Sequence, residues 1–157
     1  QAGSLAQLLA TALQQHTLSG MVISEHETLI CLLLSKPHRA GYRKQLAKGA
    51  GKARDKFVFG LDHSLEVDDR CARRVPAEHA AQEEPWILSE LRRLGAPDRC
   101  YAISTIRDLD GRTLPLEEAL SSVYGMQMGT LLSCVPGQLA YYEGEDPGER
   151  YILHRKR

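Results

Sequence analysis

The spacing of apolar residues along the 157-residue chain predicts both helices and strands. Leucine and alanine recur every three or four residues over 4–15, which is typical of a helix with one buried face. A short β-like run follows at 21–24. The apolar stretch 27–35 fits either a strand paired with 21–24 or a helix capped by Ser24. The helix is slightly favoured, because its leucines share one face.

The middle of the chain has weaker patterns. Residues 42–48 are helix formers, but the glycines that follow them break the pattern and predict a flexible loop. The Phe-Val-Phe run at 57–59 predicts a strand, with 65–67 as its hairpin partner. The polar stretch 68–85 is expected to be a linker or a loosely attached helix.

The second half of the chain has stronger patterns. Helices are predicted at 85–94, where a proline lies near the start, and at 115–124, where two acids lie in the first turn. Pro136-Gly137 marks a hairpin turn. Four strands are predicted, at 100–105, 130–135, 138–143 and 151–154.

These elements predict an α+β fold. The order α-β-α-β-β-β over 85–157 indicates an antiparallel sheet with helices on one face, a pattern typical of a compact bacterial α+β module. Residues 1–84 are expected to form a helical or mixed region with a basic loop. The two parts are either separate units or one continuous domain.

Charge is unevenly distributed along the chain, although the 20 basic and 20 acidic residues balance. Between 36 and 56 there are eight basic residues and one acid, Asp55. Such a cluster is typical of a surface that contacts a polyanion, with nucleic acid the first candidate. These basic residues, here called the basic segment, are Lys36, Arg39, Arg43, Lys44, Lys48, Lys52, Arg54 and Lys56.

The acidic C-terminal hairpin offers a second hypothesis. Tyr141 and Tyr142 must point to opposite faces of a strand, so one of them is expected at the surface. Together with Glu143, Glu145 and Asp146 it would form the interface of a protein–protein adaptor or an immunity-type inhibitor. The acids of this hairpin could instead pair with the basic segment of the same chain.

No catalytic signature has the required spacing. Residues 108–111, Asp-Leu-Asp-Gly, resemble the first motif of the haloacid-dehalogenase phosphotransferases, but Arg112 separates the glycine from the following threonine. This run is interpreted as an Asp-Gly turn between a strand and a helix. A phosphate-binding loop over 48–52 is excluded because no Ser or Thr follows its last lysine.

Metal and cofactor sites are not predicted, because the histidines lack metal-ligand spacing. A metal-dependent hydrolase is the third hypothesis, and it requires Asp108, Asp110, Glu143 and Glu145 to converge in space.

The longest apolar run has six residues, whereas a membrane span needs roughly 20, so no span is expected. The four cysteines are expected to be reduced thiols in a cytoplasmic protein. The leading prediction is a non-enzymatic binding or regulatory protein that contacts an anionic partner through the basic segment.

Overall fold

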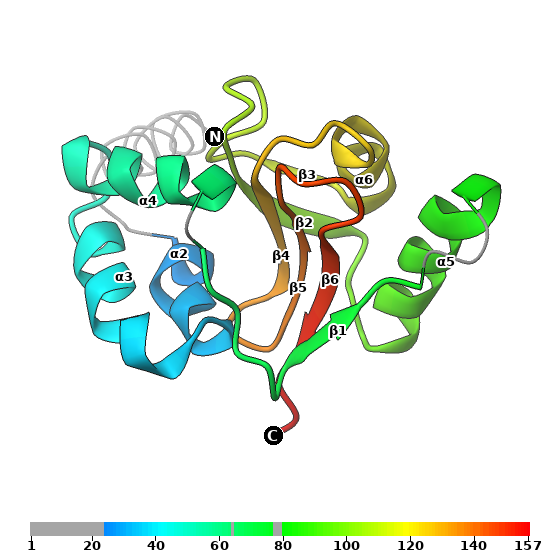
Figure 1. The fold of residues 1–157 in the computed structure, drawn as a ribbon, viewed down its shortest axis with the longest axis horizontal. Coiled ribbons are helices and arrows are strands. Elements are labelled where there is room, and N and C mark those ends of the chain that lie inside the picture. Colours follow the sequence, from blue (N-terminus) through cyan, green and yellow to red (C-terminus); the bar gives the residue numbers. More distant parts are fainter. Residues whose placement is uncertain (1–23, 64, 77–79) are drawn as a thin grey trace, which may run out of the picture.

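The computed structural model describes residues 24–63, 65–76 and 80–157, which form a mixed α+β fold (Figure 1). The helix predicted at 4–15 and most of the β-like run at 21–24 lie outside these residues. None of the helices in the described part of the chain has the length and apolar character of a membrane span.

A single six-stranded antiparallel sheet is the centre of the fold. Its spatial order is β1-β6-β5-β4-β2-β3. The four strands predicted in the second half are confirmed, and the two short edge strands were not predicted. The strands are β1 (Ala72–Arg74), β2 (Arg99–Ser104), β3 (Thr113–Pro115), β4 (Thr130–Val135), β5 (Leu139–Glu143) and β6 (Arg150–His154).

Along the described part of the chain, three α-helices precede the first strand and two more lie between strands. Ser24 caps the first described helix by accepting a hydrogen bond from the backbone N–H of His26, so the helical alternative for 27–35 is confirmed. The elements are α2 (Glu25–Leu29), the 3₁₀ turns η1 (Ile30–Leu33) and η2 (Lys36–His38), α3 (Arg39–Leu46), α4 (Lys52–His63), α5 (Ala80–Arg93) and α6 (Leu116–Val123).

The strand predicted at 57–59 is wrong, because these residues lie in the middle of α4. Helical spacing places Arg54, Phe57 and Leu61 on one buried face, which outweighs the strand propensity of Phe-Val-Phe. Val67 pairs instead with Leu34 in an isolated antiparallel bridge.

The linker alternative for 68–85 is also wrong, whereas the helical alternative is confirmed for its last residues, which belong to α5. Part of it is β1, which pairs with β6 through Arg73 and Ile152. The helix predicted from Pro85 begins earlier, at Ala80, and so contains the proline. A strand from the first half of the chain therefore completes the sheet of the second half. The division of the chain at residue 84 stays a prediction.

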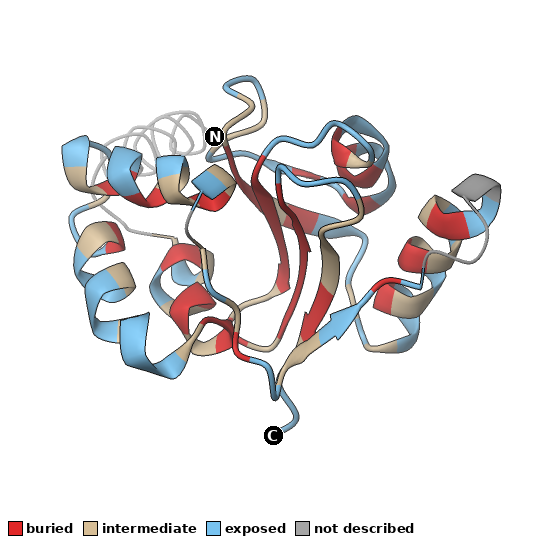
Figure 2. Ribbon diagram, in the orientation of Figure 1, coloured by how far each residue is buried: buried red, intermediate tan, exposed pale blue. Residues whose placement is uncertain are grey.

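Helices cover both faces of the sheet (Figures 1 and 2). As predicted, α5 and α6 pack on one face, where they bury residues such as Leu132 and Tyr141. The N-terminal helices α2, α3 and α4 cover the other face, over Leu131 and Tyr142. Successive strand residues point to opposite faces, so β4 and β5 are buried on both sides.

A buried ion-pair network joins the N-terminal helices to the sheet. The Arg54 guanidinium on α4 donates to Glu27 Oε1 on α2 at 2.8 Å, and to Asp110 in the β2–β3 connection at 2.6 and 2.9 Å. Tyr101 on β2 donates to the same Glu27 oxygen at 3.0 Å. Asp110 also accepts the backbone N–H of Ser104 at 3.0 Å.

Arg54 is only 8% exposed, so the cost of removing its charge from water is offset by two carboxylates. Hydrogen bonding to Asp110, and then to Glu27, holds the pKa of Arg54 above its usual value. Burial, and then the charge of Glu27, raises the pKa of Tyr101 to about 12. Its hydroxyl therefore stays protonated at neutral pH and donates the hydrogen bond to Glu27.

Replacing Arg54 should destabilise the protein strongly, because it leaves Glu27 buried without its charge partner. We expect Arg54→Ala to lower the free energy of unfolding by about 3–5 kcal/mol. Lys56→Ala, at an exposed position of the same helix, should change it by less than about 0.5 kcal/mol. Urea unfolding followed by circular dichroism measures both. Equal losses of stability in the two variants would contradict the structural role of Arg54.

Candidate polyanion-binding surface

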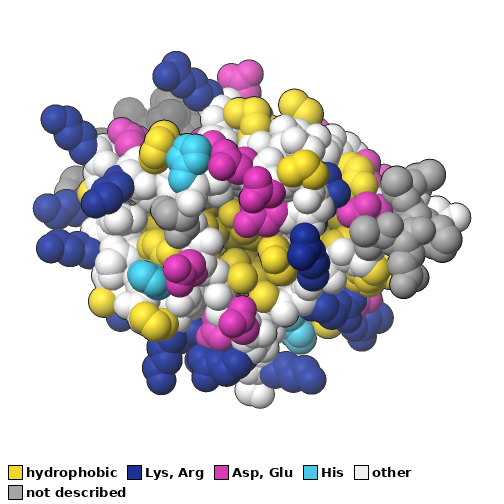
Figure 3. All heavy atoms as spheres, viewed as in Figure 1, with side chains coloured by type: hydrophobic (Ala, Val, Ile, Leu, Met, Phe, Trp, Pro, Cys, Tyr) yellow, Lys and Arg dark blue, Asp and Glu magenta, His cyan; other side chains and the backbone are white. Residues whose placement is uncertain are grey.

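Six of the eight residues of the basic segment are exposed. In the part of the chain that the structure describes, no carboxylate lies within ion-pair distance of any of them. Dark-blue side chains gather on the side of the molecule where α3 and α4 lie, and along its lower edge (Figure 3). The six exposed residues are Lys36, Arg43, Lys44, Lys48, Lys52 and Lys56.

The other two basic residues, Arg39 and Arg54, form hydrogen bonds and ion pairs within the fold. Arg54 is buried against Glu27 and Asp110, so its assignment to the binding surface is corrected. Arg39 is half-buried and donates to the backbone carbonyls of Leu34 and Leu32 at 3.0 and 2.9 Å. Among the described residues, the basic segment does not form the predicted pairs with the acids of the C-terminal hairpin. Its internal pairs join Arg54 to Glu27 and Asp110, and Arg39 to Asp68.

A turn between α3 and α4 takes the place of the predicted loop. Gly49 and Gly51 both adopt positive φ, at 68° and 136°, which side chains with a Cβ rarely do. The turn distributes the lysines over two helices and the turn itself. Lys48 lies within it and Lys52 begins α4, so charge is presented on both sides of the turn.

A basic pocket of about 540 Å³ adjoins the start of α3. Lys36 and Arg39 meet Arg155 and Lys156 there, from the end of the chain. Five cationic side chains face one carboxylate. No sequence pattern indicates this pocket, because Lys36 and Arg39 lie more than a hundred residues from Arg155 and Lys156. Its lining residues are Lys36, Arg39, Asp68, Arg70, Cys71, His154, Arg155 and Lys156.

Asp68 organises the inner wall of this pocket. Its carboxylate accepts from Arg70 at 2.7 and 3.0 Å and from Arg39 at 2.8 Å. Hydrogen bonding to Arg70 is the main cause that lowers the pKa of Asp68 to about 2. Among the described residues, Lys36, Arg155 and Lys156 have no carboxylate partner, so the pocket can bind a phosphate or carboxylate group.

Cys71 also lines the pocket, but its thiol is not activated. Burial is the main cause that raises its pKa, and the negative charge of Asp68 adds to it. A thiolate is the nucleophilic form of cysteine, so this environment opposes covalent chemistry. The four cysteines are free thiols.

The predicted surface tyrosine of the C-terminal hairpin is wrong. Tyr141 and Tyr142 do point to opposite faces, but they are 0% and 2% exposed because helices cover both faces. The Tyr141 hydroxyl donates to Glu143 at 2.9 Å, and the Tyr142 hydroxyl donates to the carbonyl of Leu61 at 2.8 Å.

Glu143 is likewise a core residue rather than an interface residue. Its carboxylate accepts from Arg150 at 3.0 Å, and from the backbone N–H groups of Gly125 and Gln127 at 3.0 and 3.1 Å. Of the residues predicted for the protein interface, only Glu145 and Asp146 are exposed.

Two carboxylates of the hydrolase hypothesis are engaged with arginines. Asp110 pairs with Arg54, and Glu143 pairs with Arg150. The predicted Asp-Gly turn is present, with Gly111 at a φ of 73°, but it joins β2 to β3 rather than a strand to a helix. Asp110 and Glu143 thus each have an arginine as a structural partner.

Another group of side chains has metal-ligand geometry. Asp62, His63 and Glu145 are the one group of three or more such residues in the described part of the chain whose ligand atoms lie within 4.8 Å of one another. His63 Nδ1 lies 3.3 Å from Glu145 Oε1. Sequence spacing missed this group, because Glu145 comes from the β5–β6 connection.

The lowered pKa of Asp68 predicts that the stability of the folded protein depends on pH in the acidic range. Its ionised form is stabilised in the folded protein, so this contribution is fully present above the ordinary value of 3.8 and is lost as pH falls toward about 2. We expect Asp68→Asn to be less stable than the wild type near neutral pH, and the difference to shrink over that interval.

Urea unfolding at a series of pH values measures this difference. Asp69→Asn is the matched control, because Asp69 is exposed and forms no ion pair with a described residue. A deficit of Asp68→Asn that stays constant down to the lowest pH would contradict the assigned role of Asp68.

Comparison with known proteins finds no matching family model, no significantly similar curated protein and no significantly similar solved structure.

Proposed function

We propose that this chain is a non-enzymatic binding or regulatory protein that contacts a polyanion, with nucleic acid the first candidate. One observation carries the proposal: six exposed cations of the basic segment have no carboxylate partner among the described residues. Lys and Arg that displace counterions from phosphates supply most of the non-specific affinity for nucleic acid.

The shape of the surface supports this proposal. The cations lie on two packed helices and the turn between them, and Lys36 connects them to the basic pocket. The surface thus combines several exposed charges, which suit a polymer backbone, with a concave site, which suits a single phosphate.

One exposed aromatic side chain lies beside these charges. Phe59 on α4 is 66% exposed, whereas Phe57 is buried and contacts the core. The centroid of the Phe59 ring lies 4.6 Å from the centroid of the His63 ring. Stacking of an unpaired base on such a ring contributes about 1–3 kcal/mol, which favours single-stranded nucleic acid.

The two other hypotheses have less support. A protein interface on the acidic hairpin now rests on Glu145 and Asp146, since its other three residues are buried. A hydrolase would need carboxylates free of arginine partners, and Asp110 and Glu143 are not free.

Removing three exposed lysines should weaken binding to a short single-stranded DNA oligonucleotide. We expect the combined variant Lys44→Gln, Lys48→Gln and Lys52→Gln to bind more weakly at low salt. The slope of log K against log salt should become shallower by about 0.7 for each phosphate that the variant no longer neutralises. Fluorescence anisotropy over a range of salt concentrations measures both quantities.

The matched control removes three exposed arginines elsewhere, as Arg92→Gln, Arg99→Gln and Arg112→Gln, with the same change in net charge. This variant should keep the wild-type salt slope. Equal weakening in both variants would show an effect of net charge alone and would contradict the assigned surface. The absence of binding by the wild type at low salt would also refute the proposal.

A further inference from the structure

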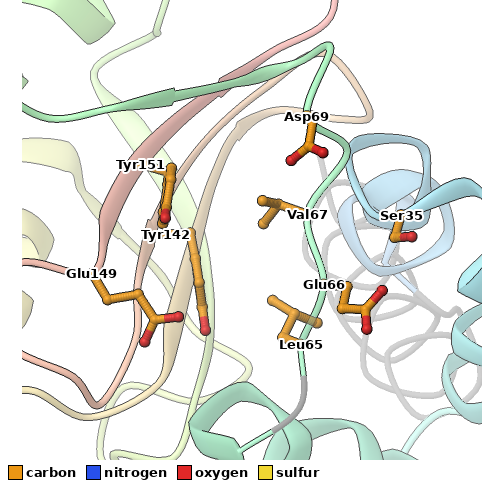
Figure 4. A pocket seen from close by; sticks show the side chains of 8 residues that line it. All are labelled: Ser35, Leu65, Glu66, Val67, Asp69, Tyr142, Glu149 and Tyr151. Carbon is orange, nitrogen blue, oxygen red and sulfur yellow. The ribbon is translucent and has the colours of Figure 1, made fainter.

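A second pocket lies on the face shown in Figure 3, between the extended segment 65–69 and strands β5 and β6 (Figure 4). Its volume is about 330 Å³. No Lys, Arg or His is among its lining residues, in contrast to the basic pocket. We call it the acidic cleft, and it is lined by Ser35, Leu65, Glu66, Val67, Asp69, Tyr142, Glu149 and Tyr151.

One wall of the acidic cleft is aromatic. The rings of Tyr142 and Tyr151 are stacked, with centroids 6.4 Å apart and planes 17° from parallel. The hydrogen bond from Tyr142 to Leu61 fixes one of the two rings. Leu65 and Val67 lie across from them (Figure 4). Aromatic faces attract cations, and aliphatic walls accept the apolar stem of a long side chain.

Carboxylates surround this apolar floor. Asp69 and Glu149 form no ion pair with a described residue, and Glu66 pairs only with His38, at 3.0 Å. Burial is the main cause that raises the pKa of Glu149. Asp69 and Glu149 therefore have no direct cation partner among the described residues, and a bound cation would stabilise the charged form of Glu149 that burial disfavours.

The backbone leaves room for the Glu149 carboxylate beside the cleft. A Cβ at Gly144 would overlap Glu149 Oε2, so no other residue fits at position 144 without moving that carboxylate. Gly144 and Glu149 are also joined by a backbone hydrogen bond of 2.8 Å. The position of this acid thus depends on a glycine in the β5–β6 connection.

We propose that the acidic cleft binds an arginine side chain presented by a basic segment of a partner protein. A guanidinium is planar, so it can stack on the partly exposed ring of Tyr151 while it donates two parallel hydrogen bonds to a carboxylate. Its three-carbon stem fits between the aromatic wall and Leu65 and Val67. The space-filling view shows an apolar floor bordered by several acidic groups and, on one side, by a basic side chain (Figure 3).

The proposal can be tested with a blocked pentapeptide of glycines around one central arginine. Chemical-shift titration of the labelled protein should show saturable changes at Tyr151, Glu149 and Gly144. The same peptide with citrulline, which has nearly the same shape without the charge, should bind at least about tenfold more weakly.

Two variants locate the site. Glu149→Gln keeps the shape of the side chain and should weaken arginine-peptide binding at least about tenfold. Gly144→Ala should weaken it as well, through displacement of Glu149. The control Glu118→Gln removes an exposed acid of α6 and should bind like the wild type.

Three outcomes would overturn the proposal: equal binding of the citrulline peptide, unchanged binding by Glu149→Gln, or shift changes that lie outside the cleft. Self-association that Glu149→Gln abolishes would assign the cleft to a second copy of the chain and would also overturn it. The triple lysine variant described above should bind the arginine peptide normally. Failure of this proposal is therefore distinguishable from failure of polyanion binding.

Discussion

The buried contact of Arg54 with Glu27 and Asp110 determines how the N-terminal helices sit on the sheet. Three elements that are distant in the sequence meet at one guanidinium, and each carboxylate needs that charge because it is largely shielded from water. Further hydrogen bonds from Tyr101 and Ser104 tie the same carboxylates to β2. The orientation of α4 is therefore fixed by polar geometry as well as by the packing of its apolar face.

This constraint also separates the charges of the protein. Because Arg54 and Phe57 face the core, Lys52 and Lys56 on the same helix are exposed to solvent. The basic edge formed by α3 and α4 thus differs from the front face, where the acidic cleft lies (Figure 3). A chain with no net charge has two surfaces of opposite character, and each suits a different class of ligand.

Local signals in the sequence were enough to predict the four inner strands of the sheet, but not its two short edge strands. Pro136-Gly137 determines the β4–β5 turn, and an apolar run precedes and follows it. The short β1 was missed because Ala-Arg-Arg has little strand propensity and is held by its pairing with β6. The strand expected at 57–59 failed because burial of Arg54, Phe57 and Leu61 on one helical face outweighs local preference.

The candidate binding surfaces were harder to predict from the sequence. The cluster of charge was visible, but the role of Arg54 depends on partners 27 and 56 residues away. The two pockets join segments from both ends of the described chain, so no local pattern marks them. Mapping of the amide shifts of the labelled protein during titration with a single-stranded oligonucleotide tests the central claim most directly. Changes centred on α3, the turn at 47–51 and the start of α4 are predicted, and changes centred on α5 and α6 would contradict it.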